Sequence, residues 1–274
     1  PVHKDWKGNK VIEQGKPLWV QNQRNSRHGI EYAYYTHLDM EQYYQRYCET
    51  LLAVDDSVGE LMHWLDESGE SENTLVLYMG DNGFLFGEHG LIDKRNAYEE
   101  SMRIPLMVKF PGVVSKGLKV PSMVANIDIA PTLLDVAGVR IPEHMDGRSF
   151  SPMLKGKNTP WRQYLLYEYF WERNYPQTPT THSLRGDRFK YIRYHGIWDK
   201  DELYDLESDP DELQNLIREP QHQSRIKDMN RVLFDMLELS KGKEIPLQRD
   251  RGTQFFHRAA GGSSASGFTS DFYQ

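Results

Sequence analysis

The chain has 274 residues, which is enough for one large domain, or for a domain with a smaller companion, around a sizeable core. Hydrophobic residues make up 38% and charged residues 27%, a balance that indicates a folded protein and excludes a disordered one. The net charge of −7 argues against a nucleic-acid partner, because most of the surface would repel a polyanion.

The ends of the chain and its cysteine content bear on where the protein works. No apolar run reaches the roughly 20 residues that a membrane-spanning helix needs. The residues after Pro1 show neither a signal peptide nor an initiator Met, so we expect the protein to continue upstream. Cys48 is the single cysteine and cannot form an internal disulfide, which leaves the compartment open.

Residues 32–68 predict one long amphipathic helix. Apolar side chains recur there at steps of three and four residues, with charged residues between them, and Gly69 ends the pattern. The apolar stripe consists of Tyr44, Tyr47, Leu51, Val54, Val58, Leu61, Met62 and Leu65. We expect this stripe to pack against another part of the protein.

The next segments indicate an α/β fold. Residues 74–79 form a continuous apolar run, as in strands buried on both faces of a parallel sheet, and residues 105–110 are a second strand candidate. The long Gly-rich loop between them is of a kind that usually carries function. Residues 126–138 predict a helix with Asp128 near its cap and Gly138 at its end. This order predicts the α/β class with a mostly parallel sheet.

The pattern changes after Gly156. Short strand candidates follow at 163–169, 188–194 and 202–206, and Pro220 precedes a helix predicted from His222 to Leu239. They predict a smaller α+β subdomain with an antiparallel sheet and one helix. We place the domain limits at 1–156, 157–242 and 243–274, the last being a polar tail rich in Gly and Ser.

Asp81 and Asn82 directly follow the first strand candidate, at the kind of position where open α/β sheets bind ligands. Carboxylate and amide oxygens suit Ca2+ or Mg2+, but such a cation takes six or more oxygens, so these two residues could supply only part of its shell. Asn82 followed by Gly83 is also a common turn sequence. Local evidence alone leaves that structural interpretation open.

Two further residues of the same loop could join this site. Lys94 would offer a compact positive charge to a tetrahedral anion, and His89 could donate a hydrogen bond or a proton to a leaving oxygen. A solvated lysine and a structural histidine are the plain alternatives. The sequence contains no Gly-x-Ser-x-Gly, His-Glu-x-x-His, Cys-x-x-Cys or phosphate-binding Gly-rich motif, which argues against the matching hydrolase, zinc and nucleotide functions.

A collinear series of motifs resembles the type I sulfatases of the alkaline phosphatase superfamily. It includes Gly80-Asp81-Asn82-Gly83, Gly87-Glu88-His89-Gly90, Asp93-Lys94-Arg95, Arg103-Ile104-Pro105, Met145-Asp146-Gly147-Arg148 and Glu202-Leu203-Tyr204-Asp205. The resemblance covers roughly Tyr43 to Leu239 and implies the C-terminal part of an alkaline-phosphatase-like sandwich with the smaller subdomain. Segments 51–56, 92–95 and 123–128 look most similar to enzymes that act on N-acetylglucosamine 6-sulfate in glycans.

The resemblance implies a role for each matching residue. Asp81 and Asn82 match the pair that coordinates a single Ca2+, with Mg2+ as an alternative, and Lys94 matches the lysine that holds the sulfate. His89 would lie near the reaction as a second catalytic residue. His182 could line the rim of the substrate pocket, or be a buried structural histidine.

The resemblance also implies elements that we do not find here. Type I sulfatases carry a Cys-x-Pro-x-Arg or Ser-x-Pro-x-Arg segment whose first residue becomes formylglycine, and Cys48 lacks the required Pro and Arg. We expect formylglycine, and an Asp-Asp pair that completes the metal shell, in an N-terminal half of the same protein. This chain alone is therefore expected to be inactive. The resemblance implies a periplasmic, secreted or lysosomal protein.

Two other functions stay open at this point. A phosphodiesterase or phosphonate hydrolase of the same superfamily would use a similar metal cradle. A non-catalytic remnant would bind a sulfated glycan or a partner chain without turnover. The first of these would still be an enzyme, whereas the second would not.

Overall fold

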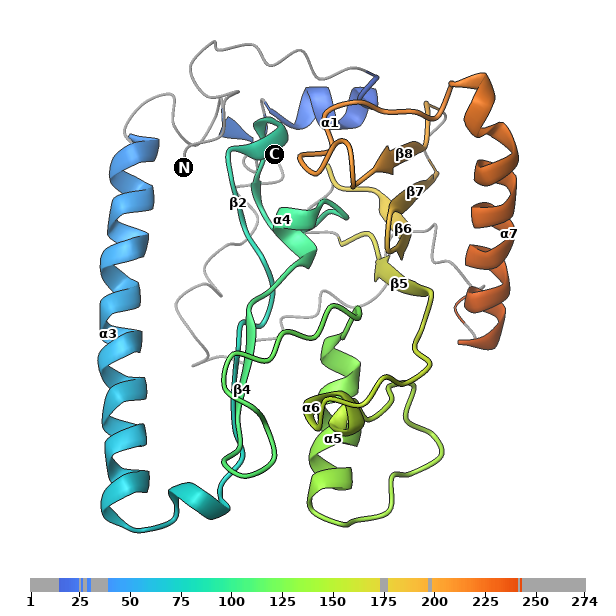
Figure 1. Cartoon of the computed structure of the whole chain (residues 1–274). Coiled ribbons are helices and arrows are strands. Elements are labelled where there is room, and N and C mark those ends of the chain that lie inside the picture. Colours follow the sequence, from blue (N-terminus) through green and yellow to red (C-terminus); the bar gives the residue numbers. More distant parts are fainter. Residues whose placement is uncertain are drawn as a thin grey trace, which may run out of the picture.

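Figure 1 shows the computed structural model of the chain, which describes residues 15–24, 26, 29–30, 39–172, 177–196, 199–240 and 242. The polar tail predicted for 243–274 and the start of the helix predicted from residue 32 lie outside these residues. Within the described part, no helix is both long and apolar enough to cross a membrane.

The long predicted helix is α3, Met40–Glu67, which runs along one side of the molecule (Figure 1). Its first turns pack on Phe86, whose ring centroid lies 5.1 Å from that of Tyr44 and 4.8 Å from that of Tyr47. Farther along, Val54 and Leu61 of the stripe are 38% and 64% exposed, and the stripe residues between and after them are only partly buried. The expectation that the whole stripe is packed is therefore wrong for this structure, because periodicity identifies the apolar face but not the segment that covers it.

The two strand candidates are confirmed as β1 (Val76–Met79) and β4 (Leu106–Lys109). They pair antiparallel, with Val76 opposite Lys109, where we expected a strand buried in a parallel sheet. All four residues of β1 are only partly buried, and Met107 of β4 is 59% exposed. The correction has a physical reason, since a continuous apolar run indicates burial but not the direction of the neighbouring strand.

The loop between β1 and β4 has structure of its own. It contains a small antiparallel pair, β2 (Leu85–Phe86) and β3 (Ile92–Asp93), the short 3-10 helix η3 (Glu88–Gly90), and α4 (Glu99–Met102). The 3-10 turns η2 (Ser71–Asn73) and η4 (Asn126–Asp128) precede β1 and α5 (Ile129–Val136), and α1 (Leu18–Gln23) and α6 (Ser151–Leu154) complete this part. The helix predicted for 126–138 is thus confirmed, with Asp128 at the cap of α5 and Gly138 just beyond its end at φ +69°.

The smaller antiparallel sheet and its helix are also confirmed. The strands β5 (Tyr164–Tyr169), β6 (Thr180–Gly186), β7 (Phe189–His195) and β8 (Glu202–Asp205) pair antiparallel in that order, and α7 (Gln223–Leu239) follows η5 (Pro220–His222). Met229, Leu233 and Leu237 of α7 pack on Leu184, Tyr191 and Leu203 of the sheet. The sequence reasoning named three of the four strands and missed β6.

A second core joins the loop to this sheet. Leu85, Leu91, Ala97 and Tyr98 of the loop are buried with Ile192, Tyr194 and Tyr204 of β7 and β8. The Tyr98 hydroxyl donates to both carboxylate oxygens of the fully buried Glu202, at 3.0 Å. The sheet therefore holds the loop in place, and the domain limits at 156 and 242 stay predictions.

Candidate functional site

Asp81, Asn82 and Lys94 lie close together at the end of β1. The Lys94 ammonium donates to Oδ1 of Asn82 at 2.7 Å, and its Nζ lies 3.9 Å from Oδ2 of Asp81. The Asp81 side chain is 88% exposed and that of Lys94 is 39% exposed. The site is therefore open to a ligand on the side of the aspartate.

Backbone contacts to α4 hold these residues in place. Gly83 donates its N–H to the Ser101 carbonyl at 2.9 Å, and the Ser101 hydroxyl donates to the carbonyl of Lys94. A Cβ on Gly83 would lie 1.9 Å from the Glu100 carbonyl oxygen, so only glycine allows this approach. The buried Ser101 thus connects the segment of Asp81 and Asn82 with the segment of Lys94.

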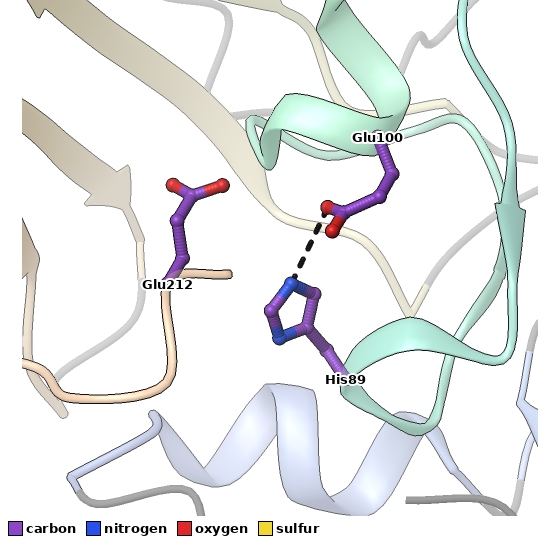
Figure 2. Close-up of side chains that lie close together, drawn as sticks. All are labelled: His89, Glu100 and Glu212. Carbon is purple, nitrogen blue, oxygen red and sulfur yellow. Dashed lines mark ion pairs between the residues drawn. The ribbon is translucent and has the colours of Figure 1, made fainter. Parts of the chain in front are cut away.

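His89 lies in the wall of the loop. Its backbone has φ +56°, which is uncommon for a residue other than glycine, and its ring stacks on Tyr98 with 3.9 Å between centroids. Its Nε2 lies 3.5 Å from Oε2 of Glu100 in an ion pair, and Figure 2 shows the two side chains turned toward each other. Burial disfavours the ionised Glu100 carboxyl, but the adjacent His89 imidazole outweighs this effect and holds the pKa of Glu100 at about 2.

Glu212 lies beside this pair and comes from the segment after β8 (Figure 2). His89, Glu100 and Glu212 offer ligand atoms within 4.8 Å of one another, a spacing that could hold a metal. Both oxygens of Glu212 are already engaged, however: Lys190 Nζ lies 2.7 Å from Oε1, and the Glu99 N–H donates to Oε2 at 2.7 Å. The group is best explained as a buried ion network that ties the loop to the small sheet.

His182 is fully buried in β6, next to the sheet neighbour His195. Its Nδ1 lies 2.8 Å from Nε2 of His195, and its Nε2 lies 3.5 Å from Oε1 of Glu168. Burial lowers the pKa of each imidazole to about 4, and the neighbouring His195 adds to this effect on His182. A place on the pocket rim stays a prediction, and in this structure the ring is enclosed by the sheet.

The residues present fit part of a hard-cation site. An aspartate carboxylate and an amide oxygen lie beside the Lys94 ammonium, and a cation bound by both would have to take the place of that ammonium at Oδ1 of Asn82. They would supply two of the six or more oxygens that Ca2+ takes. The remaining ligands would have to come from other parts of the protein.

Sequence reasoning did not single out Ser101, Glu100 or His195, which contact Lys94, His89 and His182 in turn. Nothing in the local pattern marks a serine in a short helix as the link between two arms of a site. His195 could have been found only from the pairing of β6 with β7, which places Thr181 opposite Tyr194 and brings the two histidines together.

Known proteins match this chain along most of its length. Residues 87–238 match the family model described as N-sulphoglucosamine sulphohydrolase, C-terminal, and residues 7–139 match the model described as Sulfatase. An N-acetylglucosamine-6-O-sulfatase of Bacteroides thetaiotaomicron is 36% identical over 202 residues, which cover 70% of this chain and 35% of that protein. The N-acetylglucosamine-6-sulfatase of Homo sapiens is 32% identical over 210 residues, which cover 65% of this chain and 38% of that protein.

Solved structures agree with these relatives. An enzyme in complex with its substrate D-glucosamine-2-N,6-O-disulfate superposes with a TM-score of 0.71 at 32% identity, covering 75% of this chain and 42% of that one. A phosphonate monoester hydrolase of Agrobacterium radiobacter superposes with a TM-score of 0.61 at 25% identity, covering 68% of this chain and 39% of that one. The chain spans between 35% and 42% of the length of the relatives named here. Its matching residues, fold and relatives together show that the chain belongs to the sulfatase family.

Proposed function

We propose that this chain is part of a sulfuric ester hydrolase that acts on a sulfated glycan such as one carrying N-acetylglucosamine 6-sulfate. The observation that carries the proposal is the convergence of Asp81, Asn82 and Lys94 at an open edge of the fold. The names of the relatives support the substrate class, because two of them are N-acetylglucosamine-6-sulfatases and a solved neighbour holds a 6-O-sulfated glucosamine.

The roles follow from the chemistry of each side chain. Asp81 and Asn82 would hold Ca2+, or Mg2+ in its place, and the bound cation would stabilise negative charge on the sulfuryl oxygens. Lys94 would bind the same group through its ammonium, which is half exposed and already beside the metal ligands. The nucleophile, a formylglycine, would come from an N-terminal half of the same protein, as no Cys-x-Pro-x-Arg or Ser-x-Pro-x-Arg occurs in this chain.

His89 and His182 would act by positioning the elements around the site of Asp81, Asn82 and Lys94. His89 is buried and paired with Glu100, so we propose that it fixes the loop that carries Lys94, and a direct part in catalysis stays a prediction. His182 would shape the substrate pocket through the strand that carries it.

A phosphonate monoester hydrolase is the second candidate, because a solved enzyme of that class shares the fold. The two candidates differ in the ester that they cleave fastest. Release of sulfate from 6-sulfated N-acetylglucosamine at a higher kcat/KM than release of a phosphonate product supports the sulfatase.

The test replaces Asp81 with Ala in the complete protein, with Asp187→Ala as the control at another exposed aspartate. Because the Asp81 side chain is 88% exposed, its loss should leave the fold intact. We expect sulfate release from 6-sulfated N-acetylglucosamine, measured with Ca2+ present, to fall by at least about 100-fold for Asp81→Ala and to stay unchanged for Asp187→Ala. Near-normal turnover of Asp81→Ala would place the metal elsewhere.

A further inference from the structure

A cavity of about 410 Å3 lies between β7, the residues before β8, and the first half of α7. It shares no residue with the site around Asp81 and Lys94. We propose that this cavity binds a second anionic group of a sulfated glycan, away from the sulfate that is cleaved. The proposal rests on the proposed function for its substrate class.

The first reason for proposing an anion site is the positive charge of the side chains that line the cavity. Lys200, Arg218 and Lys227 line the cavity, and no carboxylate of the described residues forms an ion pair with any of them. The chain as a whole carries a net charge of −7, whereas the lining of this cavity carries +2, with four cations (Arg193 among them) against two aspartates. An anion entering the cavity would find positive charge on several sides.

The two carboxylates at the cavity, Asp199 and Asp201, offset only part of this charge, because the lining holds four cationic side chains against these two. Asp199 accepts the N–H of Leu18. Asp201 accepts the Tyr191 hydroxyl at 2.6 Å and the Tyr194 N–H at 3.1 Å, and Arg193 lies 3.4 Å from the same carboxylate. These bonds also fix the floor of the cavity, where Tyr191 is 1% exposed.

The remaining lining suits a sugar better than a bare ion. Ile217 and Ile226 present apolar surface, on which the C–H face of a pyranose ring can pack. Nδ2 of Asn230 and Oε1 of Gln223 are left to bind hydroxyls, since the other atom of each amide is bonded within the protein. The cationic side chains would bind sulfate groups, and the apolar patch beside them would bind sugar rings. A sulfated oligosaccharide offers both, because its sulfates repeat along the chain.

The test measures binding of a heparin-derived hexasaccharide to the complete protein by calorimetry at physiological salt. The variant K200Q/R218Q/K227Q removes the three open cations, and K116Q/K119Q/K157Q removes three exposed lysines elsewhere with the same change in charge. We expect the first variant to weaken binding about tenfold or more, and the control less than twofold. The kcat for the sulfated monosaccharide should stay unchanged in both variants.

Equal loss in the two variants would overturn the proposal, since it would show attraction by overall charge alone. Tighter binding of an oligonucleotide of matched charge would also overturn it. A protein that fails to release sulfate but loses hexasaccharide binding only in the first variant would refute the proposed activity and keep this site. Normal sulfate release together with unchanged hexasaccharide binding in K200Q/R218Q/K227Q would support the proposed activity and refute this binding site.

Discussion

His182 and His195 form a close pair of imidazoles with a pKa of about 4 each, well below the ordinary value of 6.5. Between these values the unfolded chain binds protons that the folded protein does not bind. The stabilising effect of the neutral pair is therefore fully present above about pH 6.5, and is lost as the pH falls toward 4. The 2.8 Å contact from Nδ1 to Nε2 requires one ring to donate and the other to accept, which a neutral pair satisfies.

We predict that His195→Gln makes the stability of the protein less dependent on acid. Glutamine can still bind His182 but does not titrate, so the free energy of unfolding should fall less steeply between pH 7 and pH 5. The difference from the wild type at pH 5 should be roughly 1 kcal/mol, after allowance for solvent screening of a partly exposed ring. Urea unfolding at both pH values measures it.

The exposed His144 provides the control for this prediction, since His144→Gln removes an imidazole without removing a buried pair. The control should keep the wild-type slope between pH 7 and pH 5. A wild-type slope in His195→Gln as well would show that the pair does not cause the acid sensitivity.

At the scale of elements, the loop from β1 to β4 shows what could be predicted and what could not. The positions of Asp81, Asn82 and Lys94 followed from motif resemblance, and the structure brings these side chains together. The hydrogen bonds that join Gly83 and Lys94 through Ser101, and the ion pairs around His89, depend on contacts with α4 and the small sheet. A local sequence pattern does not predict such contacts. The same limit applies to β1, whose apolar run indicated burial but not its antiparallel partner.

Gly83 offers the sharpest test of this loop. Ala at this position would put a Cβ 1.9 Å from the Glu100 carbonyl oxygen, so the loop must move away from α4 and lose the bond to Ser101. We expect Gly83→Ala to lower the free energy of unfolding by a few kcal/mol and to reduce sulfatase turnover at least tenfold. Thermal unfolding and sulfate release from the complete protein measure the two effects.

Gly59 is the matched glycine, because a Cβ there meets nothing within 4 Å and α3 is helical around it. Gly59→Ala should be neutral, or more stable by up to about 1 kcal/mol through helix propensity. If Gly83→Ala behaves like Gly59→Ala in both assays, the close approach to α4 does not control the site.

For the whole molecule, the open apolar stripe of α3 is the feature that most needs a partner. Leu51, Val54 and Leu61 are 41%, 38% and 64% exposed along one face of a long helix. Soluble proteins rarely leave such a stripe in water, and the relatives are more than twice as long as the part that matches this chain. We propose that the N-terminal half suggested above as the source of the nucleophile covers this stripe.

We predict that Leu61→Glu destabilises the complete protein but not this chain alone. In the complete protein the substitution would bury a carboxylate and remove leucine packing, which should cost about 3 kcal/mol or more of unfolding free energy. Leu52→Glu is the control, because Leu52 lies on the other side of α3 and is 66% exposed, almost the same as Leu61. In the chain alone both variants should unfold at the wild-type urea concentration, since both side chains are already in water. Equal stability of the two variants in the complete protein would mean that the stripe stays open there too, and that another surface joins the two halves.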